Sequence, residues 1–246
     1  MEQPAAVALV TGAGRGLGAA CAAALARAGY RVVAVSRSAG PLDELVGSIR
    51  AAGGAAQAIV CDVTDSAAIR GAIAALDRLD VLVNNAGSNR PMPFVDVDDA
   101  TLDRLLALNT RAAFVVAQAA ARKMRQLDIA GAIINITSQM GHVGAPNRSV
   151  YCMTKHALEG LTKAMAVELA PFGIRVNSVA PSFVETPMTR TFFADPAFKD
   201  WVLQRIPLGR LGNLDEVAAA VEYLASPRAR FTTGTSLRID GGWTAQ

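Results

Sequence analysis

Short apolar runs alternate with longer segments of helical periodicity along almost the whole chain. The apolar runs lie at residues 6–10, 31–36, 55–60, 80–85, 131–137, 174–180 and 235–240. Segments with apolar positions at helical spacing occupy 16–29, 41–52, 65–77, 98–126, 148–170 and 213–225. Runs that are apolar at consecutive positions indicate strands buried on both faces, which is typical of parallel sheets covered by helices.

This alternation predicts an α/β fold, a Rossmann-like doubly wound parallel sheet with helices on both faces. Neither a low-complexity linker nor a break in composition divides the chain. We therefore expect residues 1–246 to form a single domain that binds both cofactor and substrate. Residues 186–206 interrupt the rhythm before the last helical segment, and we expect a substrate lid there.

Glycines gather between the first predicted strand and the first predicted helix, in the sequence TGAGRGLG at residues 11–18. Their spacing is not that of the common three-glycine dinucleotide fingerprint, but the physical reasons for glycine are the same. Glycine permits positive φ and close approach of the backbone, and the N–H groups at a helix N-terminus attract a pyrophosphate. The turn predicts nucleotide binding, although a tight strand–helix turn without a ligand also uses glycine.

Tyr151 and Lys155 lie four residues apart in a predicted helix, so their side chains are neighbours on one face. A free tyrosine has a pKa of about 10, and a nearby ammonium favours the phenolate. Ser138 directly follows the run at 131–137, at the carboxyl end of a strand, where open α/β sheets bind ligands. The three side chains can converge on one carbonyl group. Alternatively, Lys155 is a solvent-exposed residue and Ser138 a polar residue at a helix entry.

Several motifs in this order resemble those of the short-chain dehydrogenase/reductase family, from about residue 7 to residue 243. They are TGAGRGLG, NNAG at 84–87, YCMTK at 151–155 with Ser138 thirteen residues upstream, GIRVNSVAP at 173–181 and IDGG at 239–242. The resemblance implies a Rossmann-like domain, NAD(P) as cofactor and, commonly, a tetramer. It also implies that Tyr151 is the general acid and base, that Lys155 binds the nicotinamide ribose, that Ser138 orients the substrate oxygen and that Asn109 holds a water in a proton relay.

The motifs and the charges beside them also assign a set of cofactor contacts, with Asp62 and Val63 beside adenine and Thr186 on the carboxamide. The set is Gly12, Arg15, Gly16, Leu17, Gly18, Ser36, Arg37, Asp62, Val63, Asn84, Ala86, Gly87, Tyr151, Lys155, Pro181, Val184 and Thr186. The chain departs from the family pattern at Ser182, where glycine is usual after Pro181. A serine there could change the path of the loop that leads to Thr186.

The end of the second predicted strand indicates which dinucleotide is bound. NAD enzymes of this architecture place a carboxylate there to accept a hydrogen bond from the ribose 2′-OH. This chain has Ser36 followed by Arg37, and Arg15 lies in the glycine-rich turn. Arginine and serine suit a 2′-phosphate, so NADP(H) is favoured over NAD(H).

Composition restricts the remaining possibilities. Hydrophobic residues make up 52% and charged residues 18%, and the net charge of +3 comes from mixed charges that do not suggest a nucleic-acid surface. Three cysteines and two histidines lack metal-ligand spacing, so we expect no metal site. No apolar run is long enough for a membrane span and no secretory signal is visible, so we expect a cytoplasmic protein. Alanine-rich helices and Trp243 favour a homotetramer.

These observations predict an NADP(H)-dependent enzyme that interconverts a ketone and a secondary alcohol. Alternatives are a sugar or polyol dehydrogenase and a 3-oxoacyl thioester reductase. The latter would need a basic patch for an acidic carrier, which Arg122, Lys123 and Arg125 supply in part, although Phe172 stands where a basic residue is frequent. A non-catalytic NADP-binding scaffold is the alternative from another class. Substrate-pocket walls are expected from 88–95, 139–148 and 183–206, with His142 a candidate for substrate contact.

Overall fold

A seven-stranded parallel sheet forms the centre of the computed structural model, which describes residues 5–185 and 192–246. The strand order is β3-β2-β1-β4-β5-β6-β7 and all six pairings are parallel. The strands are β1 Val7–Thr11, β2 Arg31–Ser36, β3 Ala56–Val60, β4 Val81–Asn84, β5 Ala132–Ile136, β6 Arg175–Pro181 and β7 Ser236–Ile239. The predicted Rossmann-like fold is confirmed, and each strand coincides with a predicted apolar run, with β1 and β6 ending one residue beyond it.

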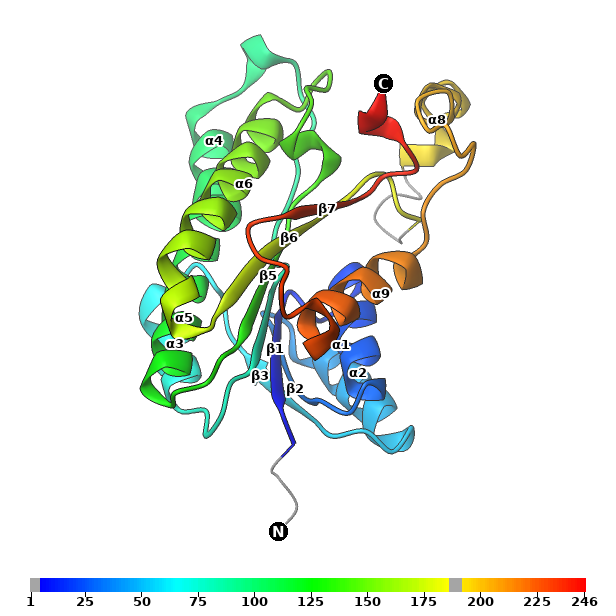
Figure 1. The fold of residues 1–246 in the computed structure, drawn as a ribbon. Helices are drawn as coiled ribbons and strands as arrows, with labels where there is room; N and C mark the ends of the chain where they lie inside the picture. Colours follow the sequence, from blue (N-terminus) through cyan, green and yellow to red (C-terminus); the bar gives the residue numbers. More distant parts are fainter. Residues whose placement is uncertain (1–4, 186–191) are drawn as a thin grey trace.

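Helices cover both faces of the sheet (Figure 1). On one face lie α1 Gly16–Arg27, α2 Ala39–Ala51 and α9 Leu214–Ala225. The other face carries α3 Ser66–Ala74, α5 Ala113–Gln126 and α6 Ser149–Leu169, with α4 Asp99–Leu106 packed against α6. Side chains that the strands send alternately to the two faces form two separate cores. In β1, for example, Ala8 and Val10 join the first core, whereas Val7 and Leu9 join the second.

The order in which strands are added to the sheet reverses between β1 and β4. The strands β2 and β3 lie on one side of β1, and β4 to β7 lie on the other side. Ligands of open α/β sheets bind in the crevice at the carboxyl ends of the strands beside such a point. Gly12 follows β1, Ser36 ends β2, Asn85 follows β4, Ser138 lies just beyond β5 and Pro181 ends β6. The residues that carry the predicted chemistry therefore lie at the same edge of the sheet.

The predicted helix at 98–126 is divided in the structure. It consists of α4, a π-helical turn η2 Ala107–Ala112, and α5. A π turn holds one more residue than an α turn and often occurs at functional sites. This turn contains Asn109, one of the predicted catalytic residues.

The predicted lid at 186–206 is only partly described, because residues 186–191, and with them Thr186, lie outside the described residues. The described part contains η5 Phe192–Ala194 and α8 Pro196–Leu203. Val202 at the end of α8 packs with Ile206 and Trp243 in a small core of its own. Figure 1 shows α8 beside the C-terminus. None of the described helices is long and apolar enough to cross a bilayer.

Candidate active site

Tyr151 and Lys155 occupy the first two turns of α6, on the same face, as their spacing predicted. Lys155 is only 5% exposed, and its Nζ donates a hydrogen bond to the carbonyl oxygen of Ile136 at 2.8 Å. The same Nζ lies 5.5 Å from the centroid of the Tyr151 ring. The ammonium is therefore held between the end of β5 and the phenol, so the prediction that these two side chains lie together is met.

The pKa values of this pair follow burial more than mutual attraction. Burial raises the pKa of Tyr151 to about 12, and a hydrogen bond with Ser138 opposes the rise. Burial also lowers the pKa of Lys155 to about 8, against the attraction of the Glu159 carboxylate. We expected the ammonium to lower the phenol pKa, but in the protein alone the removal of water is the larger effect. The Tyr151 phenol is therefore protonated at neutral pH.

Ser138 lies beside Tyr151, close enough for its side chain to lower the phenol pKa against the effect of burial. Ser138 also begins the turn η3 Gln139–Gly141, where its Oγ accepts a hydrogen bond from the Met140 amide at 3.1 Å. Its proton is directed to Gln139 Oε1 at 2.7 Å. The predicted convergence of Ser138 and Tyr151 is present, with the serine hydroxyl oriented by its own turn.

Asn109 is buried, with 1% of its surface exposed, and points from the π turn toward the loop after β4. Its Oδ1 accepts from the Ser88 amide at 2.9 Å, and its Nδ2 donates to the Ser88 carbonyl at 2.8 Å and to Thr154 Oγ1 at 3.2 Å. Asn109 thus ties the loop to the helix that carries Tyr151 and Lys155. Its predicted role in holding a relay water stays a prediction.

The glycine-rich turn has the geometry that a pyrophosphate site requires. Gly12 and Gly16 have φ of +65° and +56°, a region that L side chains rarely adopt. A Cβ on Gly18 would lie 2.3 Å from the Gly12 carbonyl oxygen, so α1 packs directly on the turn. Arg15, which precedes α1, makes no side-chain cap, and the first turn of α1 contains no acidic residue. Its amide groups are therefore suited to an anionic ligand.

Two residues outside the predicted set of cofactor contacts hold this turn in place. Thr11 Oγ1 accepts hydrogen bonds from the amides of Asn85 and Ala86, at 3.0 and 3.1 Å. Asn85 Nδ2 donates in return to the carbonyls of Thr11 and Gly12, at 2.9 and 3.3 Å. The NNAG motif therefore supports the glycine-rich turn through its second asparagine.

Asn84, the first asparagine of the motif, connects the central strands with a neighbouring helix. Its side chain is buried, and its Nδ2 donates to the Ala113 carbonyl at 2.8 Å and to Asn135 Oδ1 at 3.2 Å. Asn84 thus joins β4 to α5 and β5, and its predicted contact with the cofactor stays a prediction. Gly87 lies close to the predicted catalytic residues, because a Cβ there would lie 3.4 Å from Asn109 Oδ1 and 3.8 Å from Lys155 Nζ.

Ser36, Arg37 and Asp62 gather beyond the carboxyl end of β2. Ser36 lies against the glycine-rich turn, because a Cβ on Gly14 would be 2.9 Å from its Oγ. The Arg37 side chain is 74% exposed, and its Nη1 is 3.9 Å from Asp62 Oδ2. Hydrogen bonds from Thr64 are the largest cause that lowers the pKa of Asp62, and Arg37 contributes. Arg15 is exposed in the glycine-rich turn against which Ser36 lies, so this region fits an anionic group.

The remaining predicted cofactor residues lie around these segments. Leu17 packs against the first core, Val63 is buried in the second, and Pro181 ends β6. Val184 forms a bridge with Gly212, and the Ser182 amide donates to the Ile239 carbonyl at 3.0 Å, so the loop after Pro181 is anchored despite the serine. The Ser182 hydroxyl is buried and has no hydrogen-bond partner in the described structure, which leaves it available to a ligand.

Several residues expected to contact substrate instead contact other parts of the protein. His142 turns inward, with Nε2 2.9 Å from Ser236 Oγ and 3.2 Å from Glu159 Oε1. Among the described residues, the side chains of Phe183, Phe193, Phe198 and Trp201 pack mainly on one another and on Trp243. Phe183 lies 5.6 Å from the Trp243 ring, and Trp201 lies 5.7 Å from it. This aromatic cluster includes Phe183, which lies two residues after the end of β6.

With this geometry in hand, known proteins place the chain in a family. A family model described as Enoyl-(Acyl carrier protein) reductase matches residues 12–244. L-xylulose reductase from Bos taurus is 42% identical over 238 residues, 97% of this chain and 96% of that protein. Gluconate 5-dehydrogenase from Gluconobacter oxydans is 39% identical over 241 residues, 96% of this chain and 94% of that protein.

A solved structure agrees with these relatives. The gluconate 5-dehydrogenase from Burkholderia cenocepacia, crystallised with NADP and tartrate, has a TM-score of 0.94 and 38% identity and covers 100% of this chain and 97% of its own. The chain belongs to the short-chain dehydrogenase/reductase family, which confirms the resemblance seen in the motifs. The relatives named here are reductases and dehydrogenases, so the prediction of an oxidoreductase is confirmed.

Proposed function

We propose that the protein is an NADP(H)-dependent oxidoreductase that interconverts a ketone and a secondary alcohol on a sugar or polyol. The observation that carries this proposal is the meeting of Ser138, Tyr151 and Lys155 at the carboxyl end of β5, with Lys155 bonded to Ile136 at 2.8 Å. The names of the relatives, L-xylulose reductase and gluconate 5-dehydrogenase, support the sugar-like substrate class. We assign the binding of cofactor and the binding of substrate to one domain, residues 1–246.

In this proposal, NADPH supplies the hydride for reduction when it is bound. Tyr151 transfers its phenolic proton to the carbonyl oxygen of the substrate, which its raised pKa of about 12 permits at neutral pH. The Ser138 hydroxyl, released from Gln139, donates a hydrogen bond to the same oxygen. The Lys155 ammonium stabilises the phenolate that remains and offers a donor to the ribose.

The preference for NADP(H) rests on charge at the carboxyl end of β2. The 2′-phosphate would lie between Ser36, Arg37 and Arg15, with Arg37 leaving its loose contact with Asp62. Charge-assisted hydrogen bonds to a phosphate are the strong ones. The NADP present in the Burkholderia cenocepacia relative supports this choice.

The thioester alternative has weaker support. The Arg125 guanidinium is stacked over the Phe172 ring at 3.9 Å, beside Arg122. That contact engages one of the cations expected to receive an acidic carrier. The family model carries an acyl-carrier reductase description, so 3-oxoacyl thioesters belong in the test.

We also propose a cytoplasmic homotetramer. Apolar side chains exposed on two helices support subunit contacts: Phe114 on α5, and Met153 and Val167 on α6. Light scattering at micromolar concentration should give the mass of four chains, and a monomer would contradict this part of the proposal.

The decisive experiment follows NADPH or NADH absorbance with ketoses, polyols, aldonates and 3-oxoacyl thioesters, with Tyr151→Phe as the blank. We expect turnover of a ketose and its polyol that the variant lacks. Cofactor binding without turnover of any substrate would favour the non-catalytic scaffold. Turnover of thioesters alone would replace the sugar substrate class.

A further inference from the structure

A buried carboxylate, that of Glu159, lies behind the active site and has no part in the mechanism above. Glu159 is 6% exposed and stands on α6 one turn after Lys155 and two turns after Tyr151. Repeating the four-residue step from Tyr151 to Lys155 therefore reaches an acid on the same buried face. Carboxylates are rarely buried without partners, so its surroundings indicate its role.

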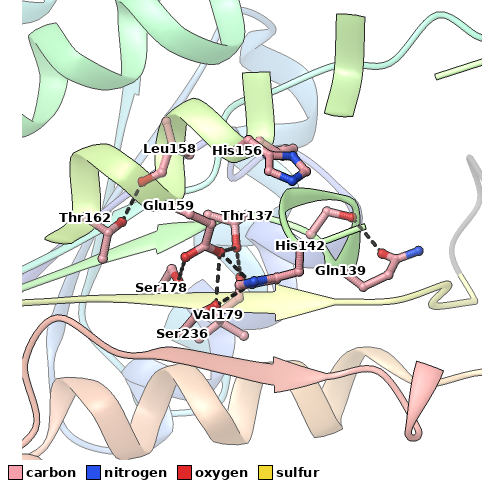
Figure 2. A network of polar contacts seen from close by, with 12 residues as sticks. Thr137, Gln139, His142, His156, Leu158, Glu159, Thr162, Ser178, Val179 and Ser236 are labelled. Carbon is pink, nitrogen blue, oxygen red and sulfur yellow. Dashed lines mark hydrogen bonds and ion pairs between the residues drawn. The ribbon is translucent and has the colours of Figure 1, made fainter. Parts of the chain in front are cut away.

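Four side chains from different parts of the sheet edge converge on this carboxylate (Figure 2). Thr137 Oγ1 and Ser236 Oγ donate to Glu159 Oε1, at 2.5 and 3.0 Å, and Ser178 Oγ donates to Oε2 at 2.8 Å. His142 Nε2 lies 3.2 Å from Oε1 and 2.9 Å from Ser236 Oγ. Because Ser236 gives its proton to Glu159, this arrangement requires Nε2 to carry a hydrogen. The Glu159 side chain thus links α6 to β6, to β7 and to both ends of residues 137–142, the Ser138 segment.

The segment that carries Ser138 is pressed directly on this part of α6. Thr137 precedes Ser138, and His142 follows the η3 turn, so Glu159 holds the segment at both ends. Between them, a Cβ on Gly141 would lie 3.0 Å from the Lys155 carbonyl oxygen and 3.2 Å from Glu159 Cγ. Any displacement of Glu159 would therefore move Ser138 relative to Tyr151 and Lys155.

Glu159 also interacts with the active site through its charge, which attracts the Lys155 ammonium. The titratable groups that face Glu159 are Lys155 on its own helix and His142 after η3, whereas β5, β6 and β7 present the hydroxyls of Thr137, Ser178 and Ser236. A buried ammonium is costly unless an opposite charge is near. The Glu159 carboxylate is such a charge, one helical turn away.

We propose that Glu159 is a positioning residue for the reaction: it fixes the Ser138 segment against α6 and keeps the buried Lys155 in its ammonium form. The proposal rests on the proposed function for its kinetic consequences, but its electrostatic part concerns the protein alone. The attraction of Glu159 already opposes the fall of the Lys155 pKa to about 8. Removing the carboxylate charge should lower that pKa further.

The test reads Lys155 directly. The chain has four lysines, so ¹³C-lysine labelling gives few side-chain signals, and Lys155→Met assigns the one of interest. We expect Glu159→Gln to lower the Lys155 pKa by about one unit. Glu168→Gln, which removes an exposed carboxylate from the same helix, is the matched control and should leave that pKa unchanged. An unchanged Lys155 pKa in Glu159→Gln would overturn the electrostatic part.

Glu159→Asp tests positioning, because it keeps the charge but is one methylene too short to reach Thr137 and Ser178 together. We expect kcat to fall about tenfold or more while the Kd for NADPH stays within about twofold of wild type and the Lys155 pKa stays closer to wild type than in Glu159→Gln. Wild-type kcat in Glu159→Asp would overturn the positioning role, even if Glu159→Gln does not fold. A wild-type protein that turns over no carbonyl compound would refute the proposed function, while the lysine titration would still decide whether Glu159 sustains the Lys155 charge.

Discussion

Lys155 Nζ donates a hydrogen bond to the carbonyl oxygen of Ile136, two residues before Ser138. This contact joins α6, which carries Tyr151, to the end of β5, which is followed by Ser138. It also leaves two of the three ammonium protons for other acceptors. The same side chain can thus hold the site together and still serve a bound ribose and the Tyr151 phenolate.

Tyr151→Phe should remove turnover and spare cofactor binding. Only the phenolic proton and its hydrogen bond with Ser138 are lost. General acid–base catalysis accounts for about 10²- to 10⁴-fold in rate, so we expect kcat to fall by at least about 10²-fold with an NADPH Kd within about twofold. Steady-state kinetics and fluorescence titration check both numbers. Substantial activity in the folded variant would refute the assigned role.

Reduction should be lost as pH rises through the Lys155 pKa of about 8. Below that pH the ammonium is present, and above it the neutral amine no longer stabilises the phenolate. The alkaline limb of kcat/KM, which reports the free enzyme, should therefore lie near that value. Tyr151, with a pKa of about 12, loses its proton only at higher pH. A flat profile up to pH values well above 8 would show that the Lys155 charge does not control the step.

Ser36→Asp should reverse or nearly abolish the preference for NADP(H). The new carboxylate would repel a 2′-phosphate and accept a hydrogen bond from the 2′-OH of NAD. One charge-assisted hydrogen bond contributes about 1.5–3 kcal/mol, which corresponds to about 10- to 150-fold in affinity. We expect wild type to prefer NADP(H) at least about tenfold in kcat/KM.

Arg37→Ala is the complementary variant. It should weaken NADP(H) and leave NAD(H) almost unchanged, because Arg37 is exposed and its nearest acid, Asp62, is 3.9 Å away. The measurement is kcat/KM with NADP(H) and with NAD(H) for wild type, Ser36→Asp and Arg37→Ala. A wild type that prefers NAD(H) would contradict the roles assigned to Ser36 and Arg37.

Gly18→Ala should damage the cofactor site. The added methyl group would lie 2.3 Å from the Gly12 carbonyl oxygen, so α1 or the turn must move. We expect NADPH affinity to fall at least about tenfold with a lower Tm. The matched control is Gly47→Ala in α2, where a Cβ meets nothing within 4 Å. That change should stabilise the helix by about 0.5–1 kcal/mol, and equal Tm values for the two variants would contradict the steric argument.

The fold could be predicted because its signal is local. Each buried strand, such as β1 with Val7 to Thr11, is apolar on both faces and therefore stands out in the sequence. The pair Tyr151 and Lys155 is also local, since one helical turn separates them. Asn84 shows the limit: a strand-end asparagine looks the same whether it faces a ligand or, as here, Ala113 and Asn135.

Glu159 was not identified from the sequence, although its position on α6 relative to Lys155 is a local feature. Its spacing from Lys155 places it on the buried face of α6, which could have been read from the sequence. Its hydroxyl partners come from three strands and depend on their register, as in the pairing of Ser178 with Ser236. The register of parallel strands joined by long connections is not visible in residue spacing, so this network required the structure.

The π turn at 107–112 makes the active site sensitive to chain length as well as to residue type. Deleting one residue there would give a regular α-helix from α4 into α5, a change that local helix geometry favours. Without the extra residue the backbone around Asn109 would take another path, and the contacts of Asn109 with Ser88 and Thr154 would be lost. In this segment the irregularity of the helix is itself a functional element, and a deletion would be more harmful than many substitutions.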